Sequence, residues 1–158
     1  MKIESCKSQA LSAKTKHANL RGQQLRELGL KATPNRIAIL EYFATVQIYL
    51  SAEETFSALR HQHPKIGLPT VYRILGELSM AGVIYKILHP NRKLYYFYCP
   101  NPGHHHHFVC LSCRTVTDID FCLCEQFQQI TDGIVQDHII QASGLCRNCA
   151  GNNVTESG

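Results

Sequence analysis

Two cysteine pairs with identical spacing, Cys110-x-x-Cys113 and Cys146-x-x-Cys149, constrain the fold of this 158-residue chain most strongly. A Cys-x-x-Cys segment turns the backbone so that two thiolates face one centre, and two such segments complete a tetrahedral sulfur site that suits zinc. The segment between the pairs is longer than in a compact zinc ribbon, so a helix and a strand must fit there. A site closed by four sulfurs holds structure and does no catalysis. A thioredoxin-like redox pair is disfavoured, because neither pair opens a helix within a βαβ pattern.

The cysteine usage also indicates the compartment. The chain has eight cysteines, and its first residues are polar and basic with no apolar segment typical of a secretory signal. We therefore expect a cytoplasmic protein whose thiols serve metal or redox chemistry and not a disulfide framework. No apolar run is long enough to cross a membrane, so no membrane partner is expected.

Charge divides the chain into two unlike parts. Residues 1–98 hold 14 Lys and Arg against 6 Asp and Glu, whereas residues 99–158 hold 2 against 6. A basic half favours a polyanion partner such as double-stranded DNA, and an acidic half rich in Cys and His favours a cation. The alternative is a chance distribution of charge over a solvated surface.

The first half reads as short helices. One fits around His17–Leu28. Thr33 and Pro34 predict the N-cap and first turn of a second helix, and Ser51 with Glu54 predicts a capping box at the start of a third.

A fourth helix opens near Pro69 and ends at Gly82. Its apolar residues recur at i, i+3, i+4 and i+7, and they are Val71, Ile74, Leu75 and Leu78. The opposite face carries Pro69, Tyr72, Arg73 and Gly76. Two strand-like runs, Val83–Leu88 and Lys93–Tyr98, follow as a hairpin. This order is typical of a winged helix-turn-helix, with the fourth helix in the DNA major groove. The alternative is a small helical domain whose outward side chains are merely solvated.

The second half predicts a small α/β unit. Short strands fit His104–Cys110, Thr115–Ile119 and His138–Ala142, and a helix fits Cys122–Gln136. We therefore predict an α+β fold with these parts: a flexible tail over 1–16, a winged-helix DNA-binding domain over 17–98, a hinge over 99–103, a dimerisation and metal-binding domain over 104–150, and a disordered tail over 151–158.

Four consecutive histidines, His104 to His107, precede the first cysteine pair. Because side chains alternate along a strand, His105 and His107 face one way and His104 and His106 the other, so one strand could serve two metal sites. Possible partners are Cys99 and Asp118 for the first pair, and Glu125 and His138 for the second. Spacing does not choose between these groupings, and a solvated polar loop is the alternative.

Three further cysteines have no assigned partner. Cys6 lies in the tail and is taken as incidental. Cys122 and Cys124 fall at a helix start, where the dipole lowers a thiol pKa, so they could be reactive. The alternative, which we favour, is that they serve as small apolar residues.

These motifs together resemble the ferric uptake regulator family of bacterial metalloregulators. The matching segments, in family order, are Thr33–Arg36, Leu50–Glu54, Gly67–Leu75, His104–His107 with Cys110-x-x-Cys113, and Cys146-x-x-Cys149. The resemblance implies an N-terminal winged helix, a C-terminal dimerisation domain and a homodimer. It also implies metal-dependent binding to palindromic operator DNA, usually as a repressor, with no enzymatic activity and no small-molecule substrate beyond metal ions.

The resemblance also assigns roles to residues. The structural zinc ligands would be Cys110, Cys113, Cys146 and Cys149. The regulatory site near the hinge would use Cys99, His105, His107 and Asp118. A second site in the dimerisation domain would use His104, His106, Glu125 and His138. The DNA-facing residues would be Arg36, Pro69, Thr70, Tyr72 and Arg73.

Three residues indicate which branch of the family the chain resembles. Tyr49 stands near the position where iron and peroxide sensors place a histidine, and Cys99 replaces a carboxylate. A thiolate favours zinc over iron or manganese, so the resemblance points to the zinc uptake regulators. Tyr85 occupies a position where zinc sensors often have His or Asp, which leaves Asp118, His89 or no residue as the fourth ligand.

Two other functions are weighed against this one. Fe²⁺ or Mn²⁺ at the regulatory site would make the chain an iron or peroxide sensor of the same family. A zinc metalloenzyme is disfavoured, because no H-E-x-x-H or similar catalytic signature is present.

Overall fold

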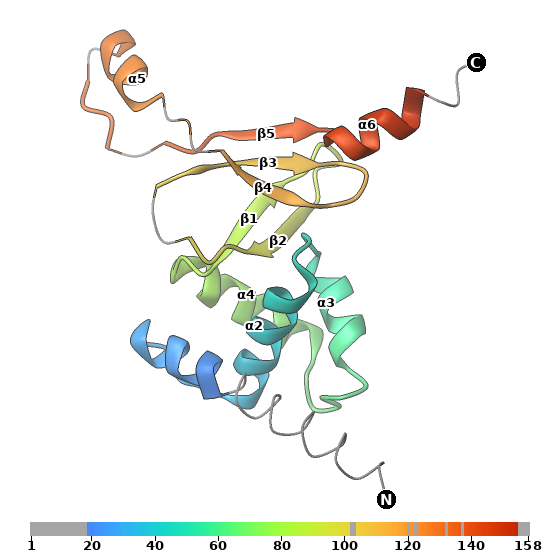
Figure 1. The fold of residues 1–158 in the computed structure, drawn as a ribbon. Coiled ribbons are helices and arrows are strands. Elements are labelled where there is room, and N and C mark those ends of the chain that lie inside the picture. Colours follow the sequence, from blue (N-terminus) through green and yellow to red (C-terminus); the bar gives the residue numbers. More distant parts are fainter. Residues whose placement is uncertain are drawn as a thin grey trace, which may run out of the picture.

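The computed structural model describes residues 19–101, 104–119, 121, 123–131, 133–136 and 138–154. Figure 1 shows the helices of the first half of the chain below, the two-stranded hairpin in the middle and the three-stranded sheet above. The molecule is thus an α+β protein with a helical end and a sheet end. No helix in these described ranges is both long enough and apolar enough to span a membrane.

The helical end follows the sequence signals closely. A first helix covers residues 19–27. Helix α2 spans Pro34–Val46 behind the Thr33 N-cap, whose side chain accepts from the Arg36 N–H. Helix α3 spans Ala52–Leu59 and begins with the complete Ser51–Glu54 capping box. These caps satisfy backbone N–H groups that have no partner inside a helix, and so fix where each helix begins.

Helix α4, Leu68–Met80, carries the predicted stripe. Val71, Ile74, Leu75 and Leu78 are all buried. They join one core with residues of the other helices and the hairpin, including Leu25, Ile39, Leu40, Phe43, Leu59, Ile84 and Tyr96. Burial of this stripe leaves the opposite face of α4, with Tyr72 and Arg73, in solvent.

The hairpin is made of β1, Ile84–Leu88, and β2, Leu94–Tyr98, in antiparallel register. Leu50 adds a bridge to Tyr96, which ties the start of α3 to the hairpin. This completes the winged-helix arrangement that the sequence predicts. Its last residue, Tyr98, directly precedes Cys99, and Cys99 packs in one buried cluster with Val109 of the upper sheet.

The upper sheet has the order β4-β3-β5. Strand β3, His106–Cys110, pairs antiparallel with β4, Val116–Ile119, and parallel with β5, Gln141–Gly144. The sequence prediction placed the last strand at His138–Ala142, whereas β5 begins three residues later. His104 and His105 lie before β3 and not within it.

Two helices differ from expectation. Helix α5 covers only Cys124–Ile130, not Cys122–Gln136, because the chain turns to extended backbone at Thr131. Two apolar residues of the predicted helix are not buried in one chain, since Ile130 and Ile134 are 76% and 86% exposed. Helix α6, Arg147–Val154, was not predicted, and it takes up the start of the segment expected to be a disordered tail.

Candidate metal centres

The four paired cysteines form one cluster. The parallel pairing of β3 with β5 places Cys110 opposite Gly144, two residues before Cys146. All four sulfurs lie within 4.8 Å of one another, and those of Cys113 and Cys146 are 3.7 Å apart. A tetrahedron with Zn–S bonds of about 2.3 Å has sulfur–sulfur edges of about 3.8 Å. The four side chains therefore fit a zinc ion.

Backbone groups prepare this cluster for a cation. Burial would raise the pKa of the Cys110 thiol, but backbone N–H groups of Cys146, Cys113 and Ser112 outweigh it and lower that pKa to about 6. A hydrogen bond from Ser112 lowers the pKa of Cys149, yet the neighbouring sulfurs, Cys146 first, raise it to about 11. The first thiolates thus form readily, and the last one needs a positive ion to balance the accumulated charge.

A second cluster, the hinge cluster, joins Cys99, His105, His107 and Asp118. Cys99 follows β2, His105 lies just before β3, and His107 lies within β3. Asp118 sits opposite His107 in the β3–β4 register. The Cys99 sulfur is 3.1 Å from His105 Nε2 and 3.9 Å from Asp118 Oδ1. The Asp118 oxygen is 3.8 Å from His105 Nε2 and 3.7 Å from His107 Nε2.

The hinge cluster has the donor set of a zinc site. Tetrahedral edges for mixed sulfur, nitrogen and oxygen ligands are about 3.3–3.6 Å, close to these distances. The buried His107 Nε2 has no hydrogen-bond partner in the structure. A buried polar atom without a partner costs free energy, and a metal ion bound among these donors would remove that cost. The residues therefore fit a metal.

Burial sets the protonation of two of these donors. It lowers the pKa of His107 to about 4, so this imidazole is neutral and ready to bind a metal at physiological pH. It raises the pKa of the Cys99 thiol, and the nearby Asp118 charge adds to the rise. The thiol must therefore lose a proton when a metal binds.

The structure separates the alternatives for the fourth donor. Asp118 is in the hinge cluster, whereas His89 packs against the rings of Tyr49 and Tyr95, with centroids 5.9 and 5.2 Å away. Tyr85 lies beside the hinge histidines, with its ring centroid 5.4 Å from that of His107. Asp118 is thus the predicted candidate that the fold brings to Cys99.

A third cluster contains His104, His106 and His138. His138 Nε2 lies 3.3 Å from that of His104 and 3.1 Å from that of His106. These values match the edge of about 3.3 Å for a tetrahedron with Zn–N bonds of about 2.0–2.1 Å. Burial lowers the pKa of His106, so it too presents a neutral imidazole. Exposed Glu125, which the sequence prediction grouped with these histidines, is not part of the cluster.

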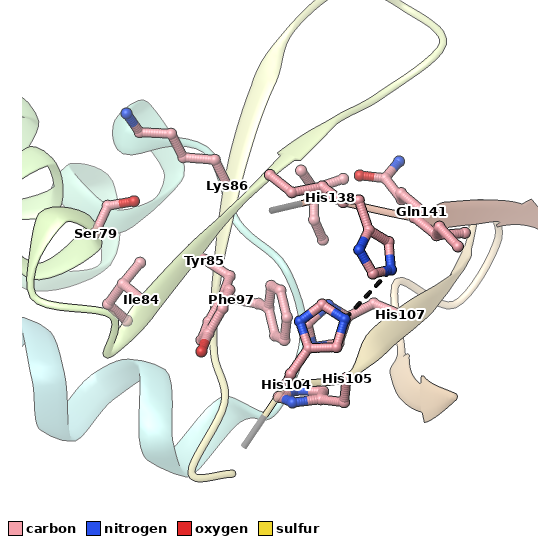
Figure 2. Close-up of a pocket in the computed structure, with 13 residues that line it drawn as sticks. Ser79, Ile84, Tyr85, Lys86, Phe97, His104, His105, His107, His138 and Gln141 are labelled. Carbon is pink, nitrogen blue, oxygen red and sulfur yellow. Dashed lines mark hydrogen bonds between the residues drawn. The ribbon is translucent and has the colours of Figure 1, made fainter. Parts of the chain in front are cut away.

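The two histidine clusters border a shared pocket of about 370 Å³ between β1 and the segment that leads into β5. Figure 2 shows histidines of both clusters around this pocket together with Tyr85 and Phe97, and a dashed line joins His104 to His138. The alternation predicted for the histidine run therefore holds, since alternate side chains join different clusters.

The residues that the sequence predicts to face DNA lie mainly on α4. Pro69, Tyr72 and Arg73 are exposed, and Thr70 is half-buried. Arg36 lies on α2 and is engaged elsewhere: its Nε and Nη2 donate to Glu77 Oε2 at 2.9 and 2.6 Å, and its side chain is 13% exposed. The exposed Arg73 also pairs with Glu77, at 2.6 Å. Arg36 therefore connects α2 to α4 and does not present its charge to solvent.

Two predicted candidates cannot be placed. Cys122 lies outside the described residues, as does the side chain of Cys124.

The structure also shows contacts between its two ends that no local sequence signal indicated. Tyr49 contacts Cys110, 61 positions along the chain, and Arg114 contacts Glu54, 60 positions away.

Comparison with known proteins decides the family. The model of the ferric uptake regulator family matches residues 27–142. The chain belongs to this family. It is 38% identical over 127 residues to the ferric uptake regulation protein of Cupriavidus metallidurans, which covers 77% of this chain and 88% of that one. The protein is therefore a metal-responsive transcription regulator, and its family is not a family of enzymes.

Solved structures agree with the fold. The Vibrio cholerae ferric uptake regulator matches with a TM-score of 0.57 at 31% identity, over 79% of this chain and 98% of that chain. A zinc uptake regulator complexed with zinc and DNA matches with a TM-score of 0.72, over 89% and 97% of the two chains. At 23% identity this second match supports the fold alone. The winged-helix domain followed by a dimerisation domain is thus the fold of this regulator.

Proposed function

We propose that this regulator is a zinc-responsive repressor that binds palindromic operator DNA as a homodimer in the cytoplasm. Members of its family are dimeric DNA-binding regulators. The family does not fix which metal is sensed, so we infer the metal from the ligands of this chain. The observation that carries the choice is the hinge cluster, where the buried Cys99 sulfur lies with two imidazoles and one carboxylate at tetrahedral spacing. Sulfur with nitrogen in four-coordination suits zinc, whereas iron and manganese favour more oxygen donors and higher coordination.

The donors come from both ends of the molecule. Cys99 is the first residue of the proposed hinge, 99–103, and directly follows the winged-helix domain, proposed as residues 17–98. The other three donors lie in the proposed dimerisation domain, 104–150. Zinc, when bound, supplies the attraction that keeps these donors together. The four donors of the hinge cluster then fix the orientation of the hairpin relative to the sheet. Because α4 packs against the hairpin, they also fix the orientation of its exposed face. In a dimer, two such faces must reach major grooves about 34–36 Å apart. Tighter zinc binding in that arrangement is what couples metal to DNA.

The other clusters have different proposed roles. The four cysteines hold a structural zinc ion that joins β3, β5 and α6. The three-histidine cluster is a second metal site in the dimerisation domain, with Glu125 outside it. On α4, Tyr72 and neighbouring residues contact bases, and Arg73 supplies a phosphate contact.

Operator binding against buffered free metal tests the proposal. We expect half-maximal DNA binding at far lower free Zn²⁺ than free Fe²⁺ or Mn²⁺. Cys99→Ser removes the thiolate and should abolish the zinc response, while the dimer and the zinc ion of the four cysteines remain. Activation by iron or manganese alone would support the second candidate, an iron or peroxide sensor, which the Asp118 carboxylate also fits.

A further inference from the structure

A set of contacts separate from the hinge cluster joins the winged helix to the turn Cys110–Cys113. Ile48, just after α2, forms a β-bridge with Thr115, just after this turn. The Tyr49 N–H donates to the Arg114 carbonyl at 3.2 Å. The Tyr49 hydroxyl donates to the Cys110 carbonyl at 3.4 Å, in the interior. The backbone of the cysteine turn is thus bound directly to the α2–α3 junction.

The Arg114 side chain strengthens this connection. Its Nη1 donates to Glu54 Oε1 at 2.5 Å, and its guanidinium lies 5.9 Å from the centroid of the Tyr49 ring. The other oxygen of Glu54 accepts from the Ser51 N–H at 2.8 Å as part of the capping box. Arg114 is therefore bound to a carboxylate that the capping box already holds in place at the first turn of α3.

The same connection extends toward the DNA-facing helix. Helix α3 packs on α4, and the Tyr72 hydroxyl on α4 donates to Glu53, the neighbour of Glu54. In the other direction, the buried Tyr49 belongs to the apolar cluster that contains Tyr95, Phe97 and Cys99. Tyr49 thus lies between the cysteine turn, the α3 cap and the strand that ends at the hinge.

We propose that Tyr49, Glu54 and Arg114, here named the clamp, are positioning residues that set the zinc concentration at which this regulator binds DNA. The clamp contacts exist in the same arrangement that holds Cys99 within ligand distance of His105 and Asp118. Any contact that stabilises this arrangement without zinc raises the affinity for zinc, because less free energy is needed to assemble the donors. This inference rests on the proposed zinc response.

The test measures binding of the full-length protein to a fluorescent DNA duplex, selected on the wild type from a random pool, against buffered free Zn²⁺. We expect Arg114→Gln and Glu54→Gln each to raise the zinc midpoint about tenfold. The double variant should be no worse than the single variants, because both remove one contact. Zinc content of the four-cysteine site and dimer mass should stay unchanged. Arg60→Gln, at the exposed end of α3, removes an equal charge outside the clamp and should leave the midpoint in place.

Two further measurements make the result decisive. The affinity of the clamp variants for zinc, measured without DNA, should also fall. A purely structural role would instead lower thermal stability and leave the zinc midpoint of DNA binding unchanged. Tyr49→Phe removes only the hydroxyl and should shift the midpoint about two- to threefold even if the charge variants fold poorly. Unchanged midpoints in the clamp variants would overturn the inference. A wild type with no zinc response would instead overturn the proposed function.

Discussion

At the scale of single residues, protonation controls how this regulator takes up metal. The His107 imidazole is neutral because burial lowers its pKa to about 4, and Cys99 is a protonated thiol because burial raises its pKa. Of these two donors, Cys99 alone must release a proton when zinc binds near neutral pH. The same residue that favours zinc therefore makes the zinc affinity depend on pH.

Cys99→Asp tests this link between protonation and metal choice. In the wild type, zinc affinity of the hinge cluster should rise by up to about tenfold per pH unit between pH 7 and 8.5, because each step removes competition by the thiol proton. A carboxylate is already ionised in this range, so the variant should show a flatter profile and a shift of preference toward iron and manganese. Competition with a chelator, with the four-cysteine site kept loaded, measures both. Parallel slopes in the two proteins would contradict the assignment.

At the scale of helices and strands, the Glu77 carboxylate on α4 forms ion pairs with two arginines that differ in exposure. Arg36 reaches it from α2 with 13% of its side chain exposed, whereas Arg73 lies on α4 itself at 58%. A partly buried, doubly hydrogen-bonded pair between helices contributes to stability, and an exposed pair within a helix contributes little. The two arginines share one partner but should differ in function.

Arg36→Met and Arg73→Met separate these roles. Arg36→Met should lower the free energy of unfolding by about 1–3 kcal/mol, because it leaves Glu77 with one partner fewer. Arg73→Met should change stability by less than about 0.5 kcal/mol, yet weaken DNA binding and reduce the salt dependence by about one counterion. Denaturant unfolding and DNA titrations over a salt series measure both. If Arg36→Met instead lost DNA affinity without losing stability, Arg36 would be assigned to the DNA interface.

For the whole molecule, the sheet end carries apolar surface that one chain does not cover. The exposed residues, with their exposed fractions, are Phe121 (62%), Ile130 (76%), Ile134 (86%), Ile139 (89%) and Leu145 (42%). Apolar surface of this kind favours association, and the family is dimeric. We therefore expect this apolar surface to face a second copy of the chain.

Ile139→Glu should weaken the dimer, because a charge would be buried at the proposed interface. We expect a shift toward monomer mass in sedimentation experiments and a matching loss of affinity for palindromic DNA. Met80→Glu is the control, since Met80 is 90% exposed at the end of α4, in the winged helix. Equal dimer stability in both variants would place the interface on another surface.

The sequence alone determined the features that depend on neighbours a few residues apart. These are the Thr33 and Ser51 caps, the buried stripe of α4, the hairpin, and the two cysteine turns with their shared centre. Only the tertiary structure decided which distant groups meet. The β3–β4 register places Asp118 opposite His107, Glu125 does not join the three clustered histidines, and Arg36 pairs with Glu77 where α2 packs on α4. Local spacing fixes caps and turns, but strand register and packing between domains are set by the whole chain, and they bring Cys99 to its partners.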